Sequence, residues 1–201
     1  MLLAWVVGIG MAQAGAPQVG PARVGGRVVV EAGQDDAVAE LYGDVALFPE
    51  VLASLALHRH AEVAVSAGYH RDGVEEGLWL RRVPLSLVGR YVVPVGDLSF
   101  LAGLGPSVVS WAETPSQVGD PGTRGTKPGV LVELAARGGM GRAPLSAPDD
   151  RAYGTRPLTW EAALGYRWSA LRHGAECPSA DLPCGLDLGA LRFSLGVQAR
   201  Y

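Results

Sequence analysis

The sequence alternates between apolar and polar residues over most of its length. The pattern is clearest in LRFSLGVQARY, where every second side chain from Leu191 to Tyr201 is apolar or aromatic. Side chains of a β-strand point alternately to its two faces, so this period of two predicts a strand with one apolar face. A helix would repeat its apolar residues every three or four positions instead. The alternation therefore favours an all-β fold.

Eight segments show the alternation, and clusters of Gly, Pro and Asp separate them. They span residues 23–33, 50–58, 61–70, 84–93, 98–107, 129–137, 158–169 and 191–201. Short alternating segments bounded by turn-forming residues are typical of strands that follow one another in an antiparallel sheet. We therefore predict eight antiparallel strands.

The polar face of these strands has an unusual composition. It combines Gly, Ala and Ser with isolated Arg and Glu, whereas a face exposed to water is rich in Lys, Glu, Thr and Asp. Small residues and charges of both signs suit the inside of a narrow barrel, where space is short and buried charges must pair. The charged residues that we expect to face this interior are Arg27, Glu31, Glu62, Arg90, Glu133, Arg137, Glu161, Arg167, Arg192 and Arg200.

The opposite face is bulky and apolar, with Trp, Tyr and Phe near strand ends. A lipid-facing band has this composition, and a closed barrel satisfies every backbone hydrogen bond inside a bilayer. The fold class that we predict is an all-β, eight-stranded antiparallel up-and-down transmembrane β-barrel after an N-terminal signal peptide. The alternative is a soluble, periplasmic lipocalin-like carrier of small ligands, whose apolar face would point inward.

The N-terminal stretch MLLAWVVGIGMAQA indicates export. An apolar run from Leu2 to Met11 precedes the tripeptide AQA, a small-x-small pattern of the kind that signal peptidase cleaves. We expect a signal peptide over residues 1–14 and an outer-membrane barrel domain over residues 15–201, although no Lys or Arg precedes the apolar run. The alternative is a buried N-terminal strand or helix. No later apolar run approaches the roughly 18 residues that a membrane helix needs.

The only two cysteines, Cys177 and Cys184, frame the stretch CPSADLPC between two predicted strands. In an oxidising compartment this spacing predicts a disulfide that pins a loop. The alternative is a metal site, for which only Asp181 and His173 lie nearby in the sequence.

The lengths of the connections fit a barrel with both chain ends on the periplasmic side. The first, third, fifth and seventh connections then face outward and should be long. They cover about residues 33–49, 71–82, 113–128 and 170–187, and the second and fourth, near 59–60 and 94–97, are short. The sixth, about residues 138–156, is too long for a periplasmic turn, so we expect either longer strands or a mobile segment there.

On these segments the chain resembles the small outer-membrane β-barrel proteins of Gram-negative bacteria, with the eight-stranded OmpA/OmpX-like membrane domain. The resemblance covers nearly all of residues 15–201. It implies an outer-membrane location, with outer-membrane lipids and lipopolysaccharide as partners. The last strand and its terminal aromatic look like the signal that the outer-membrane assembly machinery reads, in which the matching positions are Phe193, Leu195, Val197, Ala199 and Tyr201.

No catalytic, cofactor or metal site is apparent. A Ser/His site needs a nucleophile within reach of an oriented histidine, and Ser169 near His173 is the only such proximity at the predicted outer rim. We expect solvated rim positions for the four histidines, His58, His60, His70 and His173. A net charge of −3 without a clustered basic face argues against nucleic acid as a partner.

The sequence therefore favours a structural or surface-interaction protein with a lumen filled by side chains, not an enzyme and not a general diffusion pore. The alternative from a different class is a lipid-modifying outer-membrane barrel enzyme.

Overall fold

A computed structural model describes residues 20–33, 45–73, 79–114, 123–140, 158–168 and 189–201. Within these ranges no helix is long and apolar enough to cross a membrane. The strands are β1 (Ala22–Gly33), β2 (Val45–His58), β3 (Ala61–Gly68), β4 (His70–Gly73), β5 (Trp79–Val95), β6 (Leu98–Thr114), β7 (Thr123–Met140), β8 (Leu158–Trp168) and β9 (Ala190–Arg200).

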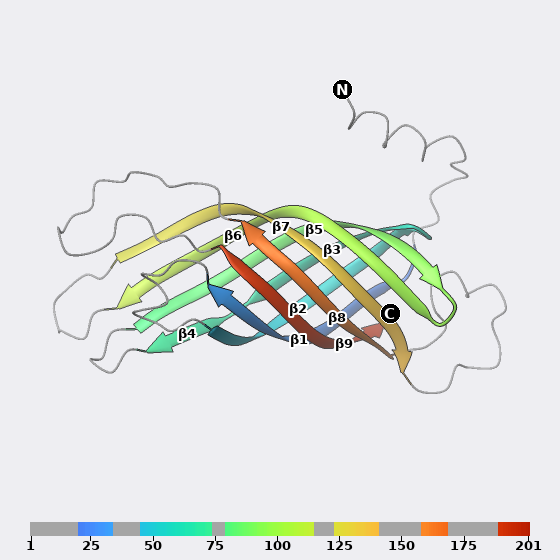
Figure 1. Ribbon diagram of the computed structural model, residues 1–201, viewed down its shortest axis with the longest axis horizontal. Coiled ribbons are helices and arrows are strands. Elements are labelled where there is room, and N and C mark those ends of the chain that lie inside the picture. The colour runs from blue at the N-terminus through green and yellow to red at the C-terminus, as the bar shows by residue number, and fades with distance from the viewer. Residues whose placement is uncertain (1–19, 34–44, 74–78, 115–122, 141–157, 169–188) are drawn as a thin grey trace, which may run out of the picture.

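These strands close into an antiparallel barrel (Figure 1). Its wall has eight strand positions, which we call staves. The hydrogen-bonded order runs β3, β2, β1, β9, β8, β7, β6, β5 and β4, and β3 also pairs with β5. β3 and β4 are two parts of one stave, because both pair with β5 in the same register and only Tyr69 separates them. Pairing of β1 with β9 completes the ring. The predicted eight-stranded antiparallel barrel is confirmed.

Alternation in the sequence becomes alternation in burial. In β2, exposed and buried residues alternate without a break from Val45 to Ala56. Leu47 on the outward face is 63% exposed, whereas Glu50 on the inward face is 2% exposed. An apolar outer face around a charged interior suits a barrel surrounded by lipid and reverses the arrangement of a soluble carrier. The lipocalin-like alternative is therefore wrong.

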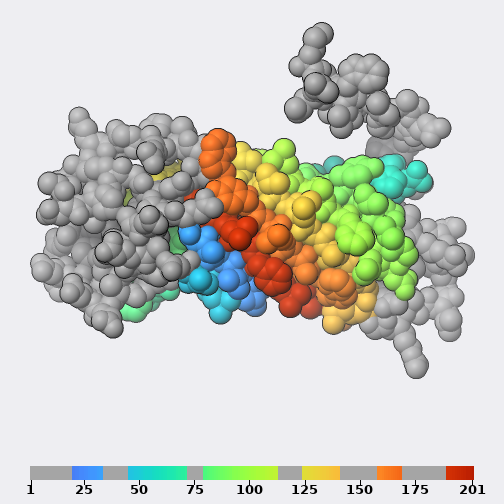
Figure 2. Space-filling model, in the orientation of Figure 1, coloured from blue at the N-terminus to red at the C-terminus, as the bar shows by residue number. Residues whose placement is uncertain are grey.

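The middle of the barrel presents a continuous outer surface, on which the side chains of β8 and β9 pack side by side (Figure 2). Its exposed large apolar residues on these two strands are Leu158, Leu164, Trp168, Leu191, Phe193, Leu195 and Val197. Such a surface is far more apolar than the surface of a water-soluble monomer.

Two tight turns mark one end of the barrel, which we call the turn end. Residues 59–60 join β2 to β3, and residues 96–97 join β5 to β6, as the sequence predicted. Gly96 has a φ of 59°, in the left-handed region that glycine enters without steric cost. The opposite end, where β1, β4, β6 and β8 finish, is called the loop end.

Four neighbouring strands, β4 to β7, extend further at the loop end than the others (left in Figure 1). β5, β6 and β7 contain 17, 17 and 18 residues, whereas β8 and β9 contain 11 each. The connections expected over 33–49, 71–82 and 113–128 were too long, because the neighbouring strands continue into them. Backbone hydrogen bonds hold a ladder together whatever its side chains, so the lipid-facing alternation stops marking a strand once it leaves the bilayer.

Several sequence predictions concern segments outside the described residues. These are the signal peptide over residues 1–14, most of the sixth connection, and the Cys177–Cys184 disulfide. β7 ends at Met140 and β8 begins at Leu158, so the described strands stop on either side of that connection.

Candidate functional site

The inward face of the barrel carries a dense set of charged side chains. Nine of the ten interior charges expected from the sequence are at most 6% exposed, and Arg200 at the turn end is partly buried. Two further charges, Arg23 and Glu50, are buried with them. The buried set is Arg23, Arg27, Glu31, Glu50, Glu62, Arg90, Glu133, Arg137, Glu161, Arg167 and Arg192.

Four of these residues form a ring of ion pairs across the lumen, which we call the central cluster. It consists of Glu62 on β3, Arg90 on β5, Arg137 on β7 and Glu161 on β8. Arg137 donates through Nη1 to Glu62 Oε2 and through Nη2 to Glu161 Oε2, both at 2.7 Å. Arg90 donates to Glu62 Oε1 and Glu161 Oε1, both at 3.1 Å. Each carboxylate is therefore held by two guanidinium groups from different strands.

A second group lies nearer the loop end and is called the outer cluster: Glu31, Glu50, Arg167 and Arg192. Arg192 Nε is 2.9 Å from Glu31 Oε1, and its Nη2 is 3.0 Å from Glu50 Oε2. Arg167 donates to Glu31 Oε2 at 2.8 Å. The two clusters are one network, because Arg27 donates to Glu50 at 2.6 Å and its Nη1 lies 3.8 Å from Glu161.

Small residues on the same face make room for this network. A Cβ on Gly196 would lie 2.4 Å from Arg27 Cβ, and a Cβ on Gly103 would lie 2.9 Å from Glu133 Cγ. These glycines are required by close approach rather than by turn geometry, since a larger side chain would displace a buried charge. The glycine content of the polar face thus has a direct structural cause.

The charges of the network are nearly balanced. Six buried arginines face five buried glutamates, so 6 − 5 leaves a formal excess of one positive charge. Buried ions cost several kcal/mol each in desolvation, which close partners and charge-assisted hydrogen bonds offset. The network links seven of the eight staves, all except β6, and it occupies the centre of the lumen with side chains.

Three buried polar residues, Arg23, Glu50 and Gln198, are missing from the interior set predicted from the sequence. Arg23 Nη1 lies 3.3 Å from Glu62 Oε2, and Gln198 Nε2 donates to Glu161 Oε2 at 2.8 Å. The alternation in the sequence already indicates that these three residues face inward. Each of the three stands an even number of residues from an inward position on its own strand, which places it on the inward face.

The structure describes three of the four histidines. His60 and His58 lie at the turn end, and the His60 ring stacks on Tyr91 with centroids 5.8 Å apart. His70 corrects the expectation of a solvated rim residue, because it is 6% exposed and its Nδ1 lies 2.9 Å from Arg82 Nη2. His70 is an even number of residues from Glu62 on the same stave, so its side chain also points inward. His173 and Ser169 are outside the described residues, and no group of three metal-ligating side chains occurs within them.

The last strand closes the barrel. Phe193, Leu195 and Val197 are exposed on the outward face of β9, and Ala199 is partly buried. Tyr201 follows the strand, is 80% exposed, and donates its backbone N–H to the carbonyl oxygen of Ala22 at 2.9 Å. The terminal aromatic residue is therefore exposed at the seam between the first and last staves.

This chain is similar to several proteins of known structure. No protein-family model matches the sequence, and no curated protein matches it significantly. The outer-membrane protein OprG from Pseudomonas aeruginosa matches with a TM-score of 0.62 and 12% identity, over 92% of this chain and 98% of that one.

Two further structures agree. Neisserial surface protein A (NspA) matches with a TM-score of 0.56 and 11% identity, over 90% of this chain and 97% of that one. Ail, the attachment invasion locus protein of Yersinia pestis, solved with the heparin analogue sucrose octasulfate, matches with a TM-score of 0.53 and 11% identity over the same shares. At these identities the likeness establishes the fold, and this chain has the fold of the small outer-membrane β-barrels.

Proposed function

We propose that this chain is an integral outer-membrane protein whose barrel is closed by its own side chains and whose interactions take place at the loop end. Its role is structural or surface-binding rather than catalytic, and it is not a general diffusion pore. The observation that carries the proposal is the combination of an apolar outer face with the central cluster across the lumen.

The outer face supports the membrane location. Its large apolar residues would face water in a soluble protein, and a closed barrel leaves no unpaired strand edge in lipid. Outer-membrane lipids and lipopolysaccharide are then the immediate partners. In this proposal residues 1–14 direct export, residues 15–201 form the barrel domain, and the assembly machinery recognises the last strand through Phe193 to Tyr201.

The interior supports a closed lumen. The inside of an eight-stranded barrel is about wide enough for side chains to fill. Arg137 contacts both Glu62 and Glu161 at 2.7 Å. A solute that crossed the central cluster would have to break these two ion pairs. Separating buried ion pairs without replacing them is strongly unfavourable.

The loop end supports a binding role. β5, β6 and β7 carry an exposed sheet beyond the ends of β8 and β9 (Figure 1). Four connections, over residues 34–44, 74–78, 115–122 and 169–189, leave the barrel at this end, and the proposed Cys177–Cys184 disulfide would pin the last of them. Contacts with lipopolysaccharide, host surfaces or other proteins are the expected use of such a surface.

Planar-bilayer recording tests the closed lumen. The refolded wild-type protein should show no large, stable single-channel conductance. The double variant Glu62→Ala/Arg137→Ala removes one opposite pair from the central cluster at constant net charge, and it should conduct more than the wild type. Large stable conductance of the wild type would overturn the closed-lumen proposal.

Two simpler assays test the other parts. Carbonate extraction should leave the protein with the membranes, and its release into the soluble fraction would refute the membrane location. Hydrolysis of lipid A or phospholipid that disappears in His173→Ala would instead assign a lipid-modifying enzyme.

A further inference from the structure

A row of three arginines crosses the outward face of the extended strands. Arg71 on β4 stands opposite Arg81 on β5, Arg81 stands opposite Ala112 on β6, and Ala112 stands opposite Arg124 on β7. All three arginines are exposed. Neighbouring strands lie about 4.8 Å apart, so this arginine row gathers three cations within about 14 Å.

The arginine row lacks the carboxylate partners of the interior. Among the side chains that the structure describes, no Asp or Glu forms an ion pair with Arg71, Arg81 or Arg124. Like charges placed directly opposite each other on a sheet are destabilising. Among the described side chains nothing offsets the repulsion between the facing Arg71 and Arg81, and an anion bound between them would reduce it.

Arg71 is also positioned by an aromatic neighbour. Its guanidinium carbon lies 4.0 Å from the centroid of the Trp79 ring. Stacking fixes the plane of the guanidinium group and leaves its N–H edges free to donate. Trp79 is exposed on the outward face, and tryptophan is enriched where apolar lipid gives way to water.

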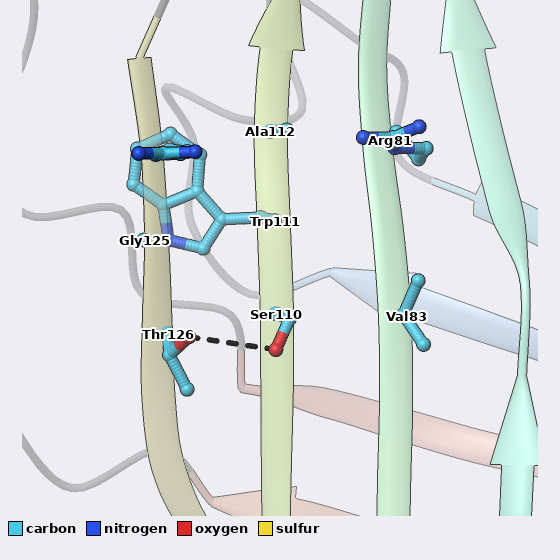
Figure 3. Close-up of a pocket in the computed structure, with 8 residues that line it drawn as sticks. Arg81, Val83, Ser110, Trp111, Ala112, Gly125 and Thr126 are labelled. Carbon is cyan, nitrogen blue, oxygen red and sulfur yellow. Dashed lines mark hydrogen bonds between the residues drawn. The ribbon is translucent and has the colours of Figure 1, made fainter.

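A shallow pocket of about 490 Å³ lies between the other two arginines. It spans β5, β6 and β7, and its lining includes Arg81, Val83, Ser110, Arg124 and Thr126 (Figure 3). Ser110 Oγ and Thr126 Oγ1 lie 3.4 Å apart on its floor. Two guanidinium groups flanking hydroxyl donors form a donor set that suits the oxygens of a phosphate group.

The pocket adjoins the exposed apolar surface of β5, because Val83, which lines it, is the next outward residue after Leu85. On the same face of β5, Leu85 and Leu87 are both exposed toward lipid. Arg81 stands four residues beyond Leu85, which is about 13 Å along the strand. An outer-leaflet lipid whose acyl chains lie against the two leucines would carry its headgroup to the arginine row.

We propose that the arginine row and its pocket bind the phosphate groups of lipid A, the phosphorylated glycolipid anchor of lipopolysaccharide. This inference rests on the proposed outer-membrane location and adds to it a defined lipid site. Two features favour a membrane lipid over a soluble polyanion. The row faces sideways on the barrel wall, and it is continuous with the apolar surface that the acyl chains would cover.

The test is a binding titration of the barrel refolded in neutral detergent. Native mass spectrometry would follow binding of bisphosphorylated lipid A, dephosphorylated lipid A, inorganic phosphate and heparin. Arg81→Ala and Arg124→Ala should each weaken binding of bisphosphorylated lipid A about tenfold, as expected for one lost charge-assisted contact. Arg59→Ala, which removes the same charge from an exposed position at the turn end, should change it less than twofold. Arg81→Lys keeps the charge but loses the fork of N–H donors, so it should retain more of the binding than Arg81→Ala does.

The following outcomes would overturn the proposal. Equal affinity for both forms of lipid A would exclude phosphate recognition. Heparin or inorganic phosphate binding as tightly as lipid A, with the same dependence on Arg81, would assign the site to a soluble anion. Heat-modifiable gel mobility reports whether the barrel has folded, so it distinguishes failure of this lipid site from failure of the proposed function. A wild type that folds into bilayers but ignores lipid A refutes this site alone, whereas one that never inserts refutes the proposed function.

Discussion

The barrel uses arginine in two contrasting ways. Inside, Arg90 and Arg137 are 4% and 5% exposed, and each holds two glutamates of the central cluster. Outside, Arg81 and Arg124 are exposed and have no carboxylate partner among the described side chains. A buried guanidinium must be neutralised within the protein, whereas an exposed one stays hydrated until a ligand arrives. Stability should therefore depend on the interior arginines, and binding on the exterior ones.

Removing a glutamate from the central cluster should have the largest effect. In Glu161→Ala, Arg90 and Arg137 each lose a partner while both remain buried. The free energy of unfolding should fall by about 3–5 kcal/mol, because an uncompensated buried charge is left behind. Urea titration of the barrel refolded into lipid vesicles measures this difference.

The double variant Glu62→Ala/Arg137→Ala provides the control for this prediction. It removes both members of one ion pair. Its loss of stability should therefore be smaller than the summed losses of Glu62→Ala and Arg137→Ala. A loss below about 1 kcal/mol for Glu161→Ala would show that the interior charges are solvated, contrary to their burial.

Placing an arginine on the lipid-facing wall should have the next largest effect. Leu164 and Leu195 are 53% and 55% exposed on the outward face of β8 and β9. Replacing either with Arg should cost about 2–4 kcal/mol if it lies near the bilayer midplane. The same vesicle titration measures it, with the inward Ser194→Thr as the control of far smaller effect. Equal tolerance on both faces would contradict the assignment of the outer face to lipid.

Changing the terminal aromatic should affect assembly more than stability. Tyr201→Ser keeps the backbone hydrogen bond to Ala22 and removes a ring that is 80% exposed, so the stability should change by less than about 1 kcal/mol. If the ring is part of an assembly signal, unfolded protein should accumulate in the periplasm. The same substitution at Phe100, an outward aromatic away from the seam, is the matched control. Normal insertion of Tyr201→Ser would refute the signal.

Much of this contrast was predictable from the sequence. Within the lipid-facing part of the barrel, one face meets hydrocarbon and the other meets the lumen, so burial alternates from Val45 to Ala56 in β2 and from Ala190 to Leu195 in β9. The interior charges followed from that period. Their partners did not, because Glu62 and Arg137 are 75 residues apart and meet only when the barrel closes.

The exterior site was not predictable in the same way. Arg71, Arg81 and Arg124 lie in stretches that the sequence suggested were connections, since above the bilayer neither face must be apolar. Only the registers of β4 with β5, β5 with β6 and β6 with β7 place the three arginines in one row. Register is a property of paired strands, and one strand's sequence does not contain it.

The smallest effect on stability is expected for Arg81→Ala, and this variant tests whether the exposed arginines serve binding and not stability. Arg81→Ala in neutral detergent should leave the free energy of unfolding unchanged or raise it by about 0.2–1 kcal/mol, because it removes the like charge that faces Arg71. Bisphosphorylated lipid A should stabilise the wild type against urea and stabilise the variant less, since a ligand that binds only the folded state shifts the unfolding equilibrium. A loss of more than about 1 kcal/mol without lipid would mean that Arg81 has a partner within the protein, and the two uses of arginine would then no longer be distinct.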